Sequence, residues 1–304
     1  MDARILDLHF DPATLVGLSQ RLMRSHHQNN YAGAVKRLNA IRAQLATMPL
    51  ASTPGFELNG LKREELIATN SMLLHEVYFA CLGAGGQDMA PAMELALQAS
   101  FGSARRWREE IIAMGKALGG GSGWVLLTFQ PREGSLVNQW ASDHAHALAG
   151  GIPILALDMY EHSYHMDFGS AAGAYVDAFM RNINWPRVYE NYQSAVEQSS
   201  ETLGATPDDL RDALLLDVRR KAIFDQSDSL VPGASWRDPG DVGSWALELP
   251  KEKEVVVYCV YGHEVGRSTA MRLNAAGLRA RFLRGGFDGW QASGRATQRK
   301  GGAS

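Results

Sequence analysis

The segment that most constrains this chain is Asp158-Met159-Tyr160-Glu161-His162, which follows the apolar run Ile152–Leu157. A run of this length is typical of a buried strand, so Asp158 would stand where that strand ends. Asp158 and His162 offer a hard carboxylate oxygen and a borderline imidazole nitrogen, a pair that suits iron or manganese and, less exclusively, zinc. The same pattern also occurs as an N-cap or a surface pair, so a metal site requires further ligands elsewhere.

Two upstream histidines lie in helical patterns. Asp11-Pro12 supplies an N-cap residue and a proline at N1, which predicts the start of a helix that contains His26. Residues Leu61–Leu82 form a second helical pattern, in which His75 has apolar neighbours on a face that we expect to be buried. A lone buried histidine is usually a hydrogen-bonded core residue. Two such helices followed by Asp-x-x-x-His indicate a metal site instead.

These motifs together resemble the iron/manganese superoxide dismutase family over about the first two hundred residues. The matching segments are His26 with Leu38-Asn39, Leu74 to Tyr78, Phe101-Gly102-Ser103, Gly121 to Trp124, Asp158 to Tyr164 and Asn184-Trp185. The resemblance implies an α+β fold, with an α-helical hairpin over about residues 1–90 and a mixed α/β half over about 91–198. It also implies one iron or manganese ion per subunit, with a solvent molecule beside four protein ligands: His26, His75, Asp158 and His162.

The substrate funnel departs from the family pattern. The pair His26-His27 offers two candidates for the first ligand, and only one can face the ion because adjacent helical residues diverge by about 100°. An ungapped match to the family, anchored on Leu38-Asn39, favours His26. The family usually carries a His and a Tyr four and eight residues later, where this chain has Asn30 and Ala34. Either Tyr31 brings its hydroxyl to the same funnel, or proton delivery to the reduced product suffers.

The outer-sphere residue, which hydrogen-bonds the metal-bound solvent, is a Gln in most members and a His in some. Ser71 stands where the second helix would supply a Gln, whereas His144 lies fourteen residues before Asp158. His144 therefore fits the His-bearing branch, and His146 is the competing candidate. Together with Ala34, this His-type residue favours iron over manganese.

The resemblance also implies roles for two residues between Asp158 and His162. Glu161 would reach across a two-fold axis to the ligand histidine of the other subunit, which implies a homodimer or a tetramer. Tyr160 stands where the family more often has Trp and would form an aromatic wall of the site. The implied activity is that of a superoxide dismutase, which converts superoxide to dioxygen and hydrogen peroxide. The alternative is a catalytically weak metal-binding stress sensor or scaffold.

A second domain is expected beyond a polar linker at residues 199–209. Apolar runs at Leu214–Arg219 and Val255–Tyr258, a helical pattern at Ser268–Ala276 and a third run at Arg281–Leu283 predict a small parallel α/β domain over residues 210–304. The motifs Leu-Asp-Val-Arg, Pro-Gly-Ala, a strand ending in Cys, and Gly-Gly-Phe-x-x-Trp resemble the rhodanese-like family.

Cys259 is the candidate nucleophile of this second domain. In the family such a cysteine is surrounded by backbone N–H groups that favour its thiolate or persulfide form. The Arg that many active members carry five residues after the Cys is replaced here by Glu264, an acid that would raise the pKa of the thiol. Either His263 or Arg267 compensates, and the domain transfers sulfur from an unidentified donor, or it is a non-catalytic docking or sensing module.

The composition agrees with a cytoplasmic enzyme. Cys81 and Cys259 are the only two cysteines and provide no disulfide framework. No apolar run approaches the length of a membrane span, and the N-terminal residues do not form a signal peptide. The charged stretch from Arg295 to Lys300 is short, and we expect it to be solvated and not to bind nucleic acid.

Overall fold

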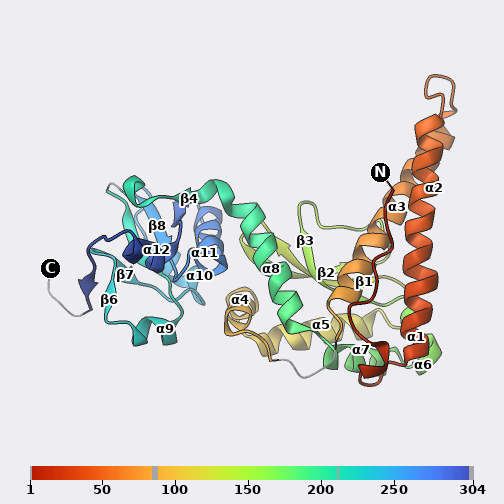
Figure 1. The fold of residues 1–304 in the computed structure, drawn as a ribbon, viewed down its shortest axis with the longest axis horizontal. Helices are drawn as coiled ribbons and strands as arrows, with labels where there is room; N and C mark the ends of the chain where they lie inside the picture. The colour runs from red at the N-terminus through yellow and green to blue at the C-terminus, as the bar shows by residue number, and fades with distance from the viewer. Residues whose placement is uncertain (1, 84–87, 211, 301–304) are drawn as a thin grey trace.

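The computed structural model describes residues 2–83, 88–210 and 212–300 of the chain. Two units lie on either side of helix α8 (Trp185–Ser200) in Figure 1. We call everything up to the end of α8 the N-terminal unit, and everything from strand β4 (Gly204–Ala205) onward the C-terminal unit. Residues 199–209, the predicted linker, hold the end of α8, β4 and two 3-10 turns, Glu201–Leu203 and Pro207–Asp209.

The N-terminal unit begins with a long antiparallel helical hairpin. Its first arm joins α1 (Gln20–Ser25), a π-helical turn (His26–Tyr31) and α2 (Ala32–Thr47), and its second arm is α3 (Gly55–Ala80). The arms pack through residues three, four and seven apart, the spacing that places side chains on one helical face. The buried residues of this stripe are Ala34, Val35, Leu38 and Ile41 on α2, and Ala68, Ser71, Leu74, His75, Tyr78 and Phe79 on α3.

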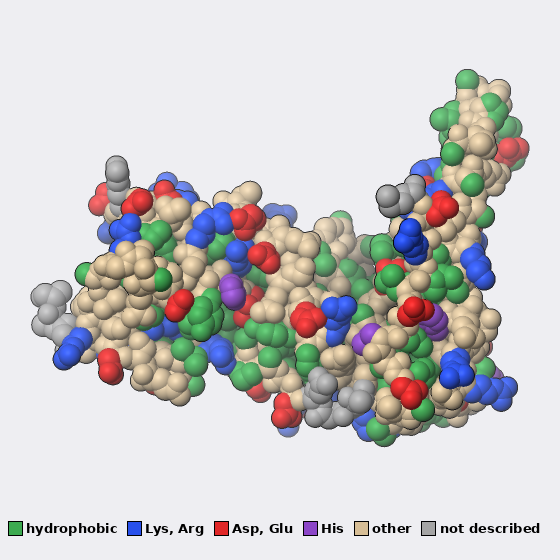
Figure 2. Space-filling model, in the orientation of Figure 1, with side chains coloured by type: hydrophobic (Ala, Val, Ile, Leu, Met, Phe, Trp, Pro, Cys, Tyr) green, Lys and Arg blue, Asp and Glu red, His purple; other side chains and the backbone are tan. Residues whose placement is uncertain are grey.

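The tip of the hairpin projects from the body of the molecule. Figure 1 shows it as an arm, and in Figure 2 hydrophobic side chains lie at its end. Leu50 and Phe56 near the tip are 63% and 76% exposed. Only the base of the hairpin therefore takes part in the N-terminal core.

The first helix starts later than the sequence predicted. Asp11 caps only one 3-10 turn, Pro12–Thr14, after which Leu15 is extended. Helix α1 has its own N-cap, Ser19, whose hydroxyl accepts a hydrogen bond from the Leu22 N–H. The prediction that Asp11-Pro12 opens the helix of His26 was wrong, because a serine eight residues later supplies the capping oxygen.

Beyond the hairpin, a three-stranded antiparallel sheet in the order β2-β1-β3 forms the core of the N-terminal unit. The prediction of a buried strand before Asp158 is confirmed, since Asp158 is the last residue of β3. Helices α3 and α8 pack against β3, while α5 packs against β1. The elements of this half are α4 (Pro91–Phe101), α5 (Ala104–Ala117), β1 (Trp124–Gln130), β2 (Ser135–Ala141), β3 (Ile152–Asp158), α6 (His165–Phe168) and α7 (Ala172–Arg181).

The C-terminal unit is built on a five-stranded parallel sheet in the order β4-β9-β8-β5-β7. The predicted strands and the predicted helix are confirmed, although the helix begins earlier, at Glu264. The elements are β5 (Leu214–Asp217), α9 (Lys221–Gln226), β6 (Ser229–Leu230), β7 (Ser235–Trp236), α10 (Val242–Trp245), β8 (Glu254–Tyr258), α11 (Glu264–Ala275), β9 (Arg279–Leu283), α12 (Gly286–Ala292) and β10 (Gln298–Arg299). Of the helices in the described ranges, none is both long enough and apolar enough to cross a membrane.

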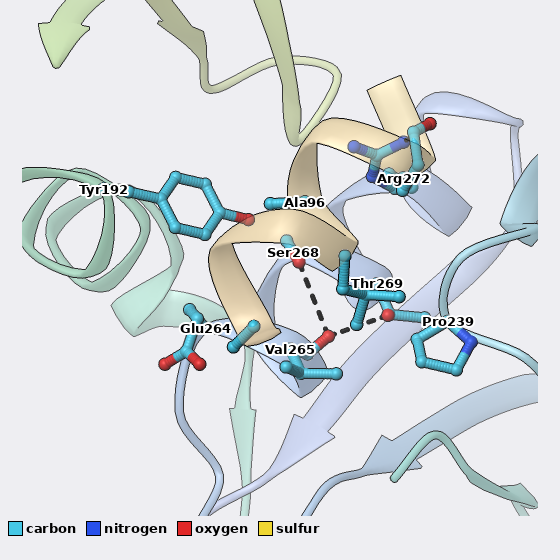
Figure 3. A pocket seen from close by; sticks show the side chains of 11 residues that line it. Ala96, Tyr192, Pro239, Glu264, Val265, Ser268, Thr269 and Arg272 are labelled. Carbon is cyan, nitrogen blue, oxygen red and sulfur yellow. Dashed lines mark hydrogen bonds between the residues drawn. The ribbon is translucent and has the colours of Figure 1, made fainter. Parts of the chain in front are cut away.

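Helix α11 joins the two units, because it packs on its own sheet and also on α8. Met271 belongs to the hydrophobic cluster of the N-terminal unit. The Arg272 guanidinium donates to Ala99 O and Ser100 Oγ at the end of α4, both at 2.8 Å. Figure 3 shows this junction, where Ala96 of α4 and Tyr192 of α8 face α11. The two units therefore share a packed interface.

Candidate metal centre

Four potential metal ligands converge in the N-terminal unit. His26 opens the π-helical turn, His75 lies on α3, Asp158 ends β3, and His162 lies in the 3-10 turn Glu161–Ser163. One ligand atom from each side chain lies within 4.8 Å of all the others. His26 and Asp158 are fully buried and His75 is 1% exposed, whereas the side chain of His162 is 26% exposed. The structure thus brings together all four residues that the resemblance implied.

The three imidazoles surround one oxygen of Asp158. Its Oδ2 lies 3.0 Å from His26 Nε2, 3.1 Å from His162 Nε2 and 3.6 Å from His75 Nε2. The other oxygen, Oδ1, accepts a hydrogen bond from the Tyr160 N–H at 2.8 Å. Ser163 Oγ donates to Asp158 O at 2.9 Å and so fixes the turn after β3. This turn is the reason that a four-residue spacing points both Asp158 and His162 to one centre.

His75 is held in the tautomer that a metal ligand needs. His75 Nδ1 lies 2.6 Å from the carbonyl oxygen of Ser71, so Nδ1 carries the proton and donates it. The buried Nε2 then presents a lone pair toward Asp158 and has no hydrogen-bond partner among the described residues. Two electron-rich atoms facing each other in a dry site call for a cation between them, and three imidazoles with one carboxylate suit iron or manganese.

The pKa values of three of these residues, His26, His75 and Asp158, are lowered. Burial lowers the pKa of His26, and it lowers the pKa of His75 to about 3. Burial alone would raise the pKa of Asp158, but the facing imidazoles of His162 and His26 outweigh it and lower that pKa. At neutral pH, Asp158 therefore carries a negative charge, while His26 and His75 are neutral.

Tyr31 reaches the neighbourhood of the site because the helix widens. The N–H of Ala32 bonds the carbonyl of His27, five residues earlier, which is the π-helical pattern. Tyr31, five residues after His26, therefore stays near the same face, and its ring centroid lies 6.3 Å from that of His75. Its hydroxyl donates to Glu76 Oε1 at 3.0 Å and accepts from the Leu6 N–H at 2.9 Å.

The same hydroxyl of Tyr31 borders a cavity of about 130 Å3 between the N-terminal segment and the base of the hairpin. Burial, the largest effect, raises the pKa of Tyr31 to about 12. The phenol is consequently protonated at neutral pH and is able to act as a hydrogen-bond donor. Ala34, at the place of the family's tyrosine, is buried in the hairpin.

His144 lies beside the cluster, whereas His146 does not. Trp124 Nε1 donates to His144 Nδ1 at 3.0 Å, so the proton of the neutral His144 ring is on Nε2. The ring centroid of His144 lies 6.2 Å from that of His75 and 4.7 Å from that of Tyr160, with which it stacks. His146 is exposed and hydrogen-bonds to Ser142. Of the two candidates, His144 is the one that lies beside the cluster.

Tyr160 forms the middle of a stack of three rings. It stacks on His144 on one side and on His162 on the other, where the ring centroids lie 5.4 Å apart. Burial raises the pKa of Tyr160 to about 12, with a smaller contribution from Asp158. Glu161, next along the chain, is exposed beside the partly exposed His162.

Cys259 lies in the C-terminal unit, at the end of β8. The thiol is 6% exposed and borders a cavity of about 350 Å3. Burial raises the pKa of Cys259, as does Glu264, while backbone hydrogen bonds from Gly266, Gly262 and His263 act in the opposite direction. Arg267, one of the two predicted compensating cations, donates to Gly262 O and Glu201 Oε2 and does not line the cavity. His263 does line it.

Three functional contacts were missed at the level of the sequence. They are the Ser71 carbonyl that orients His75, the Trp124 indole that orients His144, and the contact of Glu264 with Tyr189 of α8. Trp124 belongs to the segment Gly121 to Trp124 that carried the family resemblance, but its contact with His144 did not follow from that match. Of the other two contacts, one involves a backbone atom and the other joins residues 75 positions apart. A single sequence has no pattern that would indicate either.

Comparison with known families divides the chain in the same way as the fold. Residues 89–191 match the family model for the C-terminal domain of iron/manganese superoxide dismutases. Residues 201–293 match the model for the rhodanese-like domain. The first match covers the sheet, Asp158 and His162, and the second covers Cys259 and its cavity.

Individual relatives cover the N-terminal unit. A protein of Cupriavidus metallidurans named superoxide dismutase [Fe] is 66% identical over 186 residues, which are 61% of this chain and 94% of that protein. Superoxide dismutase [Fe] of Aquifex aeolicus is 31% identical over 196 residues, 62% of this chain and 91% of its own. Superoxide dismutase [Mn] 1 of Halobacterium salinarum is 33% identical over 187 residues, 60% of this chain and 90% of its own.

Proposed function

The chain belongs to the iron/manganese superoxide dismutase family, and from that premise we propose that His26, His75, Asp158 and His162 are the protein ligands of its ion. The chain is a superoxide dismutase and ends in a rhodanese-like domain. Its cofactor is iron or manganese, and the 66% identical relative named for iron favours iron. The observation that carries the ligand assignment is the convergence of four ligand atoms within 4.8 Å.

The charges of the proposed ligands suit a site that attracts an anion. When bound, an iron or manganese ion would supply the one-electron steps that turn two superoxide ions into dioxygen and hydrogen peroxide. Asp158 contributes one negative charge and the neutral imidazoles contribute none, so a positive centre remains that attracts an anion. The buried positions of His26, His75 and Asp158 keep bulk water away from three sides. The partly exposed edge of His162 marks the open side.

We assign the outer-sphere donor to His144 and the proton relay to Tyr31. Trp124 holds the His144 ring in the tautomer whose Nε2 carries a proton, and Tyr160 keeps the ring plane parallel to that of His162. The Tyr31 hydroxyl bonds Glu76 beside a cavity, and this contact supports a path for protons from solvent toward the reduced product. Tyr31 would thus replace the tyrosine missing at Ala34.

A homodimer formed through the Glu161–His162 region completes the proposal. Glu161 is exposed and lies next to the only partly exposed ligand of the cluster. In a two-fold dimer a residue on one copy can contact its neighbour's equivalent site reciprocally. The Glu161 carboxylate of one subunit would then accept the Nδ1–H of the other subunit's His162. We also propose a cytoplasmic location, which the two unpaired cysteines support.

The test is superoxide dismutation by the purified full chain, normalised to its iron and manganese content. Turnover that follows one metal supports the enzyme and the ligand set together. Stoichiometric metal with negligible turnover would favour the alternative, a metal-binding stress sensor or scaffold.

Sulfur transfer through Cys259 is a second candidate function. The observation that favours it is the ring of three backbone N–H groups around a thiol that borders a cavity. Such groups stabilise a thiolate or a bound sulfur anion. Transfer of sulfur to cyanide by the wild type but not by Cys259→Ser would support this activity. Equal transfer by both proteins would exclude it.

A further inference from the structure

The cavity at Cys259 is composed of residues from both units. Its volume is about 350 Å3, which is within the usual range of small-molecule sites. Cys259, Arg220 and Glu264 line it from the C-terminal unit. Tyr189 and Gln193 of helix α8 line it from the N-terminal unit. The dismutase domain therefore forms one wall of a site that belongs to the rhodanese-like domain.

Glu264 is fixed against this wall. The Tyr189 hydroxyl donates to Glu264 Oε1 at 2.7 Å, and Gln193 Nε2 donates to Oε2 at 3.2 Å. The Glu264 side chain, at the first residue of α11, is only 7% exposed. Because both carboxylate oxygens accept hydrogen bonds, the Glu264 side chain is held in one orientation beside the cavity.

Helix α11, which carries Glu264, is packed against the dismutase domain. Met271 of α11 belongs to the hydrophobic cluster of the dismutase domain, and the Arg272 guanidinium donates to Ala99 O and Ser100 Oγ. A Cβ added at Gly134 would lie 2.7 Å from Met271 Cβ, which shows how closely the β1–β2 connection approaches α11. Figure 3 shows the same contact region from close by. The volume of the cavity, about 350 Å3, suits a small molecule.

The charges that face the cavity nearly cancel. Arg219 is buried and pairs with Asp217 at 2.6 Å, so it adds no net charge. Arg220 forms no ion pair or side-chain hydrogen bond within the described ranges, and it leaves one positive charge at the cavity. Glu264 adds one fixed negative charge. A donor with one negative charge can pair with Arg220, whereas a dianion must also approach Glu264.

We infer that Glu264, held by Tyr189 and Gln193 of the dismutase domain, selects the sulfur donor of Cys259: a small, singly charged persulfide is accepted and dianionic thiosulfate is rejected. This inference rests on the proposed sulfur transfer. The donor binds as the anion R–S–S⁻ and takes up a proton from solvent at its terminal sulfur. The Cys259 thiolate attacks that sulfur, so a new Sγ–S bond forms as the donor S–S bond breaks and the thiolate R–S⁻ leaves. The new Cys259 persulfide passes its proton to R–S⁻, and no external oxidant or reductant is needed.

The experiment compares the two donors on the full-length protein. Cysteine persulfide and thiosulfate are each added, and the rate at which Cys259 gains one sulfur atom is followed by intact mass. We expect the wild type to react about tenfold faster with the persulfide. Glu264→Gln removes the negative charge. The amide oxygen of the new side chain still accepts from the Tyr189 hydroxyl, and its NH2 group donates to the oxygen of Gln193 once the Gln193 amide has flipped. The thiosulfate-to-persulfide rate ratio should therefore rise about tenfold.

Glu252→Gln is the matched control. It removes one negative charge at an exposed position of the same domain that does not line the cavity, so the rate ratio should stay within about threefold of the wild-type ratio. Dismutase activity of each variant checks that the chain is folded. An equal thiosulfate-to-persulfide ratio in the wild type and Glu264→Gln would overturn the selection by Glu264. Absence of sulfur gain at Cys259 with either donor in every variant would instead overturn sulfur transfer itself.

Discussion

His75 Nε2 faces Asp158 Oδ2 across 3.6 Å while the opposite nitrogen of the same ring donates to the Ser71 carbonyl. The backbone of α3 thereby decides which nitrogen of His75 is free to bind a metal. Because the tautomer is set by a main-chain atom, it does not depend on the identity of the residue at position 71.

This arrangement predicts different outcomes for two substitutions. His75→Ala removes a ligand and should lower the iron or manganese content at least about tenfold, with a matching loss of turnover. Ser71→Ala retains the carbonyl that orients His75, so its metal content should stay near that of the wild type. Elemental analysis of both purified variants provides the measurement. Full metal occupancy in His75→Ala would exclude His75 as a ligand.

The indole of Trp124 should matter for turnover without holding the metal. Trp124→Phe removes the donor to His144 Nδ1, which frees the ring to take the other tautomer. We expect a loss of about tenfold in turnover per metal ion. His146→Ala, on the exposed side of the same loop, is the control and should retain wild-type turnover. A Trp124→Phe variant as active as the wild type would show that the tautomer of His144 is fixed by something else.

Tyr31→Phe tests the proton relay. Loss of the hydroxyl breaks the bonds to Glu76 and the Leu6 N–H, and turnover at saturating superoxide should fall about tenfold while metal content is unchanged. The pulse-radiolysis rate at low and high superoxide separates proton delivery from substrate capture. If turnover is unchanged and only the melting temperature falls, the hydroxyl merely ties down the N-terminal segment.

Glu161→Ala tests the subunit contact. Removing the exposed carboxylate should shift the protein from dimer to monomer in sedimentation experiments at micromolar concentration. Glu190→Ala, another exposed acid, removes only a surface pair with Arg187 and should leave the assembly unchanged. A wild type that sediments as a monomer, or a dimer that persists in Glu161→Ala, would contradict the proposed contact.

The pH dependence of alkylation should distinguish the two cysteines. Burial raises the pKa of Cys259 above its ordinary value, so its thiolate fraction at neutral pH is below that of a free cysteine and rises as the pH increases. Burial raises the pKa of Cys81 to about 12, so Cys81 should stay unlabelled in the native protein. Glu264→Gln should move the Cys259 profile to lower pH. A Cys259 profile with a midpoint below that of free cysteine would show that the backbone N–H groups outweigh burial.

Local signals along the chain determined much of the fold. The apolar run before Asp158 became β3, and the runs at Val255–Tyr258 and Arg281–Leu283 became the centre of the second sheet. These assignments succeeded because strand formation depends on neighbouring apolar residues that the sequence displays directly. The prediction of where the first helix begins was wrong. Two residues that can cap a helix, Asp11 and Ser19, precede it, and only the packed structure shows that Ser19 caps it.

By itself, the sequence determined the two families, the strands that carry Asp158 and Cys259, and the side chains expected to surround the metal. Only the tertiary structure decided which His75 nitrogen faces Asp158, how the π-helical turn places Tyr31, and that Tyr189 of one unit fixes Glu264 of the other. The physical reason is the range of the interactions. Residue type and short spacing encode propensity and donor chemistry, whereas tautomers, helix widening and contacts between distant helices arise only when the packed chain brings their atoms within hydrogen-bonding distance.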